Sequence, residues 1–254
     1  MALDKSTCIA YYTLDNTLND ATGNLSALTN TGWSYNASGK INGCYSATGG
    51  NDTLNTGQST YFRTTEGAVS MWIYPTATSG DFILGDRISG SGASVNWMQL
   101  MNYNNATNTV FFSFDLGDTE ASASAVGYPI AINTWGHIVA TWGSRGMEIW
   151  VNGTLRASNV SHTSNWDNGG SGSTMRIGAV DQYSGSWFEG RIDEVGFFNV
   201  QIDSDAISSL YNSGNGLSYD DFPTSGYANK VNGVSGVGKV NSVEAGNISK
   251  VDGV

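Results

Sequence analysis

Short stretches in which apolar and polar residues alternate recur along most of the chain. This period of two is that of a β-strand, and clusters of Gly, Asn and Ser separate the stretches as turns would. Long patterns with helical spacing are nearly absent, so the chain is predicted to form an all-β sandwich or barrel. The first strands are expected over residues 7–14, 40–46, 60–63, 68–74, 81–84, 95–101 and 109–114.

The strongest alternation lies in the middle of the chain. Residues 133–142 alternate throughout, and residues 147–158 contain the pair Asn152-Gly153, which favours a tight type I′ hairpin turn. A glycine-rich loop over residues 159–173 and a further strand, TMRIGAV, follow. This order predicts consecutive antiparallel strands.

The segment from Trp187 to Gly214 changes its period midway, from strand-like to helical. Asp203 or Ser204 can cap the helix, and Gly214 supplies a stop. The adjacent acids Asp193 and Glu194 lie in the strand half, where alternation places them on opposite faces of the sheet. Because buried charge needs partners, this position is either an ion site or a hydrogen-bonded structural knot.

Charge and termini exclude several classes of partner. The 22 acidic and 11 basic residues give a net charge of −11, which argues against nucleic acid. No apolar run is long enough for a membrane span, and the first residues resemble no export signal, so neither a membrane partner nor secretion is expected. Without export, free thiols are favoured over a disulfide for Cys8 and Cys44.

The last residues differ in character from the rest. Residues 219–229 have the composition of a linker, and residues 230–254 repeat Lys-Val-Asn or Lys-Val-Asp units with valine at every third position. A period of three fits a segment wound with copies of itself, which would make a homotrimer. Small hairpin turns and a disordered linker are the alternatives.

Seven segments occur in the order found in one family, and together they cover residue 9 to about residue 211. They are YYTLDNTLNDATGN, GKINGCYSATGG, AVSMWIYPT, NTWGHIVATW, MEIWVNGTLRAS, MRIGA and FEGRIDEVGFFNVQIDSDAISSLY. Residues 1–218 thus resemble a laminin-G-like domain of the concanavalin A-like superfamily, which implies an antiparallel jelly-roll β-sandwich. The Lys-Val-Asn-Gly-Val tail resembles the C-terminal ends of bacteriophage virion proteins.

The chain is expected to lack catalysis. Glycosidases of this superfamily pair carboxylates on one strand, but Glu189, Asp193 and Glu194 do not reproduce their Glu-x-Asp-x-x-Glu spacing. Of the two histidines, His137 is expected to be structural and His162 stands alone in a polar loop.

A structural calcium ion is the cofactor that the resemblance implies. In some relatives such an ion lies where the first-strand loop meets the late IDEV strand, which makes Asp20, Asn24 and Asp193 the candidate metal ligands. The loop also offers the amide and backbone oxygens that calcium prefers. The alternative is that Asp20 and Asn24 build an Asx turn and that Asp193 accepts backbone N–H bonds.

Tryptophans are candidates for stacking on sugars, because an aromatic face packs well on the C–H face of a pyranose. Those outside strongly alternating strands are Trp33, Trp97, Trp166 and Trp187. Trp166, beside Asp167 and Asn168 in a loop, is the best ligand-binding candidate. The others are assigned to packing: Trp72, Trp135, Trp142 and Trp150.

The leading functional hypothesis is a non-enzymatic phage virion protein, either a capsid decoration or a head or tail fibre component. It would display a lectin-like domain that binds cell-surface glycans, and its tail would attach to other virion proteins. The protein would be made in the host cytoplasm and localise to the virion. The alternatives are a bacterial extracellular carbohydrate-binding or adhesion module and, third, a glycan-active enzyme.

Overall fold

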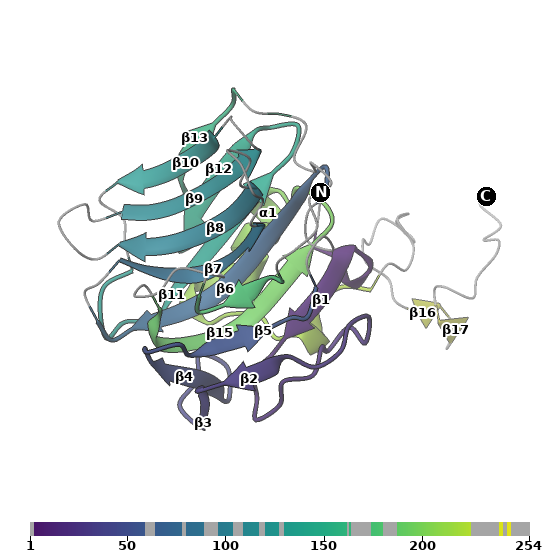
Figure 1. Cartoon of the computed structure of the whole chain (residues 1–254). Helices are drawn as coiled ribbons and strands as arrows, with labels where there is room; N and C mark the ends of the chain where they lie inside the picture. The colour runs from purple at the N-terminus through teal and green to yellow at the C-terminus, as the bar shows by residue number, and fades with distance from the viewer. Residues whose placement is uncertain are drawn as a thin grey trace, which may run out of the picture.

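The fold is described from a computed structural model (Figure 1). It describes residues 3–58, 64–77, 80–88, 96–103, 109–116, 120–126, 130–161, 163, 174–179, 187–224, 239–240 and 243–244.

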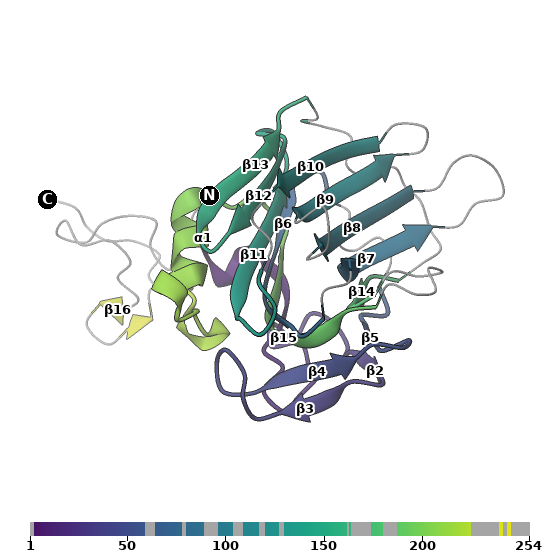
Figure 2. The ribbon, with the colours of Figure 1, turned by 90° about the vertical axis from the view of Figure 1, so that its left-hand side faces the viewer.

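Two antiparallel sheets form the body, which confirms the predicted β-sandwich (Figures 1 and 2). The first, called here the β15 sheet, has the order β13 (Thr154–Asn159), β12 (Met147–Val151), β11 (Gly136–Trp142), β6 (Gly67–Pro75), β15 (Glu189–Phe198), β4 (Cys44–Thr48) and β3 (Ser34–Asn36), with β1 (Cys8–Tyr12) also paired to β15. The second, called the β9 sheet, has the order β10 (Glu120–Val126), β9 (Thr109–Leu116), β8 (Asn96–Tyr103), β7 (Gly80–Ile88), β14 (Arg176–Ile177), β5 (Thr53–Asn55) and β2 (Thr29–Thr31).

Strand β15 organises the first sheet, because its two halves have different neighbours. Its first half pairs with β4, from Glu189 opposite Thr48 to Ile192 opposite Tyr45. Its second half pairs with β1, while β6 runs along its other side. The late strand therefore joins the N-terminal strand to the centre of the sheet.

The core lies between the two sheets. Alternate residues of β6 and β11 point inward, including Met71, Ile73, Ile138 and Ala140, and all four are fully buried. Each large apolar side chain buried in this way contributes about 1.5–3 kcal/mol relative to an exposed one. The cysteines Cys8 and Cys44 are free and buried, in line with the thiols that the sequence favours.

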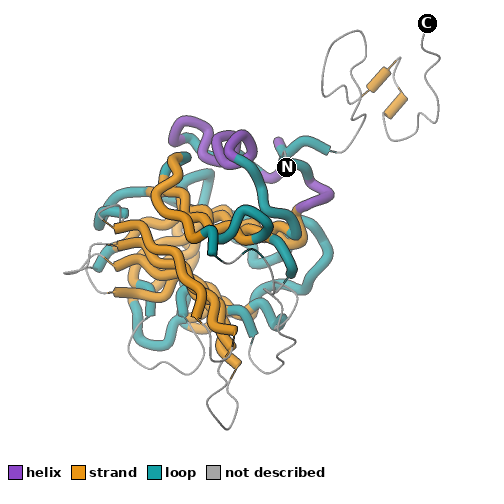
Figure 3. Tube along the Cα trace, turned by 90° about the horizontal axis from the view of Figure 1, so that it is seen from above, coloured by secondary structure: helices purple, strands orange, loops and turns teal. Residues whose placement is uncertain are grey.

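A second apolar layer covers the outer face of the β15 sheet, the face turned away from the β9 sheet. Helix α1 (Ser204–Tyr211) lies there, as Figure 2 shows, and buries Ile207 and Leu210. The Asp203 carboxylate caps the helix by accepting a hydrogen bond from Ala206 N at 3.0 Å. Helical segments lie together on this side of the sheets (Figure 3).

Three short helical turns accompany α1: η1 (Lys5–Thr7), η2 (Asn212–Gly214) and η3 (Tyr219–Asp221). The Tyr11 ring stacks on Tyr219 at 5.1 Å and meets Phe222 edge-on at 5.1 Å. The folded body therefore extends to Phe222, four residues into the range expected to be linker.

The hairpin prediction at β12 and β13 is confirmed. Asn152 and Gly153 have φ values of 50° and 71°, the left-handed pair that a type I′ turn requires. The helix ends earlier than expected, because Asn212 at φ 46° caps it before Gly214 is reached. The expected strand over residues 60–63 lies outside the described residues.

In the tail the structure describes β16 (Lys239–Val240) and β17 (Val243–Glu244), which pair antiparallel. Within the described part of the chain, no helix combines the length and the apolar character needed to cross a membrane.

Candidate functional site

Two aromatic side chains of β6 lie on the outer face of the β15 sheet. Trp72 and Tyr74 alternate with the inward-pointing Ile73, so both face away from the core. Trp72 is buried and stacks on Tyr211 of α1, with ring centroids 5.9 Å apart. Tyr74, two residues further on, stays partly exposed.

One more aromatic ring and two cations contact this pair. The partly exposed Trp135 ring lies 5.5 Å from the Tyr74 ring at an interplanar angle of 59°. The Arg191 guanidinium lies 4.8 Å above Tyr74, and the Lys40 ammonium lies 4.5 Å above Trp72. We call these five residues the outer-face strip: Lys40, Trp72, Tyr74, Trp135 and Arg191.

A backbone hydrogen bond positions Trp135 beside Tyr74. Asn133 N donates to Pro75 O at 2.7 Å, which holds the segment before β11 against the end of β6. The strand β11 begins at Gly136, three residues later than expected, so Trp135 lies on this connecting segment. The sequence pattern predicts that Trp135 packs in the core, whereas in the structure it is partly exposed beside Tyr74.

His137 has the structural role expected of it. Its Nε2 lies 2.8 Å from Ser70 Oγ, and its ring lies 5.0 Å from Trp72. Complete burial lowers the pKa of His137 to about 3, so the imidazole is neutral at physiological pH. A histidine enclosed in this way does not exchange protons with a ligand.

The acids Asp193 and Glu194 depart from the strict alternation that the sequence predicts. The register of β15 with β6 shifts between Asp193 and Gly196, and Glu194 has a φ of 51°. Glu194 is therefore the extra residue of a β-bulge. Because the bulge interrupts the alternation, the two carboxylates do not have to face opposite sides of the sheet.

Asp193 is a hydrogen-bonded structural knot. Its Oδ2 accepts from Lys40 N at 2.7 Å and Ile41 N at 3.0 Å, and its Oδ1 accepts from Glu194 N at 3.0 Å. Asp15 helps to hold the same loop by accepting from Gly43 N at 2.8 Å. Burial raises the pKa of Asp193 to about 9, although the amides of Ile41 and Lys40 oppose that effect. Asp193 thus ties β15 to residues 40–41, not to the Asp20 loop as expected.

Asp20 and Asn24 form the Asx-type arrangement that was the alternative to calcium. Asp20 Oδ1 accepts from Tyr11 N and Thr22 N, and its Oδ2 accepts from Thr22 Oγ1 and Leu25 N. Asn24 Nδ2 donates to Ile9 O at 3.2 Å.

This geometry does not fit a calcium ion as it stands. A carboxylate has about four acceptor positions, and Asp20 uses four. Across the described segments, no group of three or more His, Cys, Asp and Glu side chains is placed to hold a metal ion. Calcium binding by Asp20, Asn24 and Asp193 stays a prediction, which a calcium titration can test.

Another buried acid, Glu148, also serves the fold. Its Oε2 accepts from Thr141 Oγ1 at 3.0 Å and Trp150 Nε1 at 3.2 Å, and it forms an ion pair with Arg145 at 3.1 Å. Arg145 donates further to Ile202 O at 2.8 Å, which ties β12 to the segment before α1. Glu148 is therefore a structural acid.

The tryptophans predicted as candidates for sugar stacking differ in their exposure and in whether the structure describes them. Trp33 is a core residue, 4% exposed and stacked on Phe188 at 6.4 Å, so it offers no surface to a sugar. Trp187 is partly buried. The loop with Trp166, Asp167 and Asn168, the side chain of Trp97, and His162 all lie outside the described residues.

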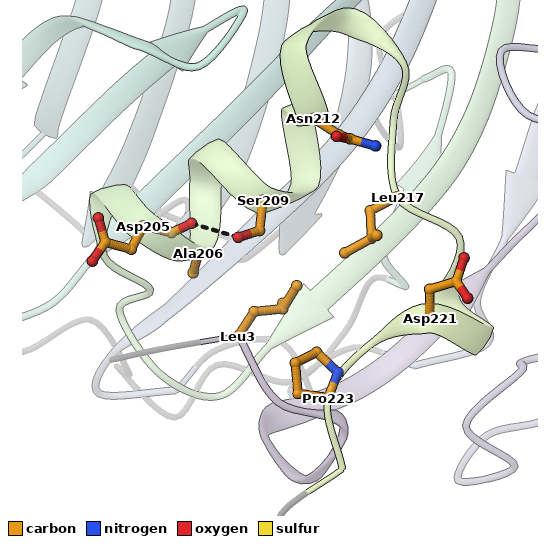
Figure 4. Close-up of a pocket in the computed structure, with 8 residues that line it drawn as sticks. All are labelled: Leu3, Asp205, Ala206, Ser209, Asn212, Leu217, Asp221 and Pro223. Atoms are coloured by element: carbon orange, nitrogen blue, oxygen red, sulfur yellow. Dashed lines mark hydrogen bonds between the residues drawn. The ribbon is translucent and has the colours of Figure 1, made fainter. Parts of the chain in front are cut away.

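A hollow of about 420 Å³ lies between α1 and the segment that ends at Pro223 (Figure 4). Figure 4 shows Leu3, Ala206, Leu217 and Pro223 around its centre, while the Asp205 carboxylate points away. Ser209 Oγ donates to Asp205 O at 2.8 Å. The lining contains no aromatic ring, so the hollow lacks a stacking surface.

Comparisons with known proteins agree with the fold. The family model described as the concanavalin A-like lectin/glucanases superfamily matches residues 48–208. No curated protein sequence matches the chain.

Among solved structures, one similar structure is domain 4 of AbnA, a GH43 extracellular arabinanase from Geobacillus stearothermophilus, in complex with arabinotriose. It has a TM-score of 0.68 and 17% identity over 85% of this chain and 100% of that chain. The CBM40 of the Ruminococcus gnavus IT-sialidase, bound to α2,3-sialyllactose, has a TM-score of 0.54 and 12% identity over 65% of this chain and 94% of that chain.

The receptor-binding domain of botulinum neurotoxin D has a TM-score of 0.59 and 14% identity. The match covers 83% of this chain and 53% of that chain. At these identities the structural likeness shows the fold, while the family match covers more than half of the sequence. The chain therefore belongs to the concanavalin A-like lectin/glucanases superfamily.

Proposed function

We propose that the protein is a non-catalytic glycan-binding module of a phage virion. The observation that carries glycan binding is the partly exposed pair of Tyr74 and Trp135 on the outer face of a lectin-like sandwich. Such a pair offers an apolar surface for the C–H face of a sugar ring, and Arg191 beside it offers hydrogen-bond donors for oxygen atoms.

Three buried acids support a module without catalysis. Glycoside hydrolysis requires two carboxyl groups that face each other across a substrate. Asp20, Glu148 and Asp193 instead accept hydrogen bonds from the backbone and from neighbouring side chains. Similar structures include modules solved with arabinotriose and with sialyllactose, which supports a saccharide as the ligand.

The virion part of the proposal rests on the tail. Its Lys-Val-Asn repeats resemble the ends of phage virion proteins, and they would attach the module to capsid or fibre proteins. Mass spectrometry of purified particles tests this part. The protein is expected among the virion components, and its absence from particles would refute the virion role.

A glycan array tests the binding part. The wild-type chain is expected to bind a subset of glycans, and Trp135→Ala is expected to abolish that binding. Tyr35→Ala is the matched control, because Tyr35 is a 44% exposed aromatic residue on β3 and lies outside the strip. A wild-type chain that binds no glycan would overturn the proposal, as would loss of binding in both variants alike.

A further inference from the structure

Two cations in the outer-face strip form no ion pair with a described acid, although acids outnumber bases two to one in the chain. Lys40 and Arg191 each lie over an aromatic ring of β6. Among the described residues neither forms an ion pair, whereas Arg145 pairs with Glu148 at 3.1 Å. The acid that does interact with Lys40 is Asp193, which is fully buried, so the solvent-facing side of the strip presents two cations.

The guanidinium of Arg191 keeps most of its donors free. It has five N–H groups, and Nη1 donates to Ser38 O at 3.2 Å. Its guanidinium carbon lies 4.8 Å from the centre of the Tyr74 ring, and among the described residues Ser38 O is the one hydrogen-bond acceptor of the side chain, so other N–H groups are available to a planar anion. A carboxylate fits that edge, because it can accept two parallel hydrogen bonds.

The nearest acids on the same strand do not neutralise Arg191. Asp193 is fully buried and accepts the backbone amides of Lys40 and Ile41. Glu189, two residues before Arg191, forms no ion pair with it among the described contacts. An anion that approaches the strip therefore meets Arg191 with donors available.

The spacing of the strip suits a sugar with a carboxylate. Asp193 lies opposite Trp72 and Arg191 lies opposite Tyr74 in the β15–β6 ladder. Trp72 and Tyr74 are two residues apart, so the two cations lie over positions about 7 Å apart along β6. Trp135 lies beside Tyr74, so one sugar unit can contact an aromatic ring and a cation together.

We propose that the outer-face strip binds a carboxylate-bearing saccharide, such as a uronic or sialic acid. Arg191 pairs with the sugar carboxylate, Trp135 and Tyr74 pack against its C–H face, and Lys40 adds positive potential. This inference rests on the proposed function and names the class of glycan that the module selects.

Isothermal titration calorimetry tests this selectivity. The probes are trigalacturonic acid and its neutral counterpart galactotriose, with 3′-sialyllactose and lactose as a second pair. The wild-type chain is expected to bind one acidic member at least about tenfold more tightly than its neutral counterpart. Arg191→Gln is expected to remove that preference.

Arg191→Lys keeps the charge but loses the planar fork, so its affinity should fall between those of the wild type and Arg191→Gln. Lys5→Gln is the matched control, because Lys5 also lies over an aromatic ring, Tyr219, at 4.8 Å, but outside the strip. Its affinity should equal that of the wild type. If Arg191→Gln fails to fold, Arg191→Lys and the salt dependence still provide the test, since acid binding should weaken between about 0.1 M and 1 M salt.

The outcomes separate the two proposals. If the wild type binds acidic and neutral saccharides equally, or if Arg191→Gln keeps the preference, acid selectivity is refuted while glycan binding stands. If the wild type binds neither these probes nor any glycan on the array, both proposals are overturned.

Discussion

Replacement of Glu194 by glutamine should change how the stability of the protein depends on pH. Glu194 is 2% exposed, and neither carboxyl oxygen accepts a hydrogen bond of normal geometry. Burial raises the pKa of this carboxyl to about 8 from an ordinary value of 4.5, while the nearby Tyr11 hydroxyl opposes the shift. Glutamine has nearly the same size as glutamate, so the substitution leaves the left-handed backbone conformation at φ 51° in place. Unlike glutamate, it never ionises.

The sign follows from proton binding in the two states. Between pH 4.5 and pH 8 the folded protein keeps the Glu194 proton and the unfolded chain loses it, so stability falls as the pH rises. Below pH 4.5 both states are protonated and Glu194 has no effect. From these two pKa values, the Glu194 contribution falls by about 2–3 kcal/mol between about pH 5 and about pH 7.

The assay is urea unfolding followed by tryptophan fluorescence at both pH values. Relative to the wild type, Glu194→Gln should gain about 2–3 kcal/mol of unfolding free energy between about pH 5 and about pH 7. Glu189→Gln is the control on the same strand, because Glu189 is only partly buried. A relative gain below about 0.5 kcal/mol for Glu194→Gln would show that this carboxyl is not held protonated, and the reasoning would fail.

Three further predictions concern calcium, the loop ligand and the helix cap. Because Asp20 already accepts four hydrogen bonds, millimolar calcium should leave the melting temperature unchanged, and a rise would show instead that Asp20, Asn24 and Asp193 bind the ion. Trp166→Ala should weaken glycan binding if the loop with Asp167 and Asn168 contributes, whereas unchanged binding on the array would exclude it. Asp203→Ala removes the hydrogen bond to Ala206 N and should cost about 1 kcal/mol, which lowers the melting temperature by about 2–4 °C, and an unchanged temperature would contradict the cap.

The sandwich could be predicted where burial imposes a clear period on the sequence. Strands β6, β11 and β12 lie between other strands and are buried along nearly their whole lengths, so their apolar residues stand out. Strands β2 and β3 were missed because they are three residues long and mostly exposed. Strand β4 begins at Cys44, not at Lys40, because the distant Asp193 carboxylate accepts the amides of residues 40 and 41.

The candidate site was much harder to predict than the fold. Tyr74, Trp135 and Arg191 are far apart in the sequence, and only the order of strands β11, β6 and β15 brings them together. Trp135 directly precedes an alternating strand, so the pattern extended over it and assigned it to packing. One signal could have marked Trp135 as a strand boundary. Trp135 lies two residues after Asn133, a residue type that favours turns and that has a φ of 58° in the structure.

The central claim is that a saccharide binds on the outer-face strip. Nuclear magnetic resonance of the tryptophan indole N–H groups tests it directly during titration with trigalacturonic acid and 3′-sialyllactose. The Trp135 signal should shift in a saturable way, whereas the signal of Trp142, which is buried between the sheets, should stay in place. A titration in which the Trp135 signal does not move, or in which a bound saccharide shifts only other tryptophans, would contradict the account.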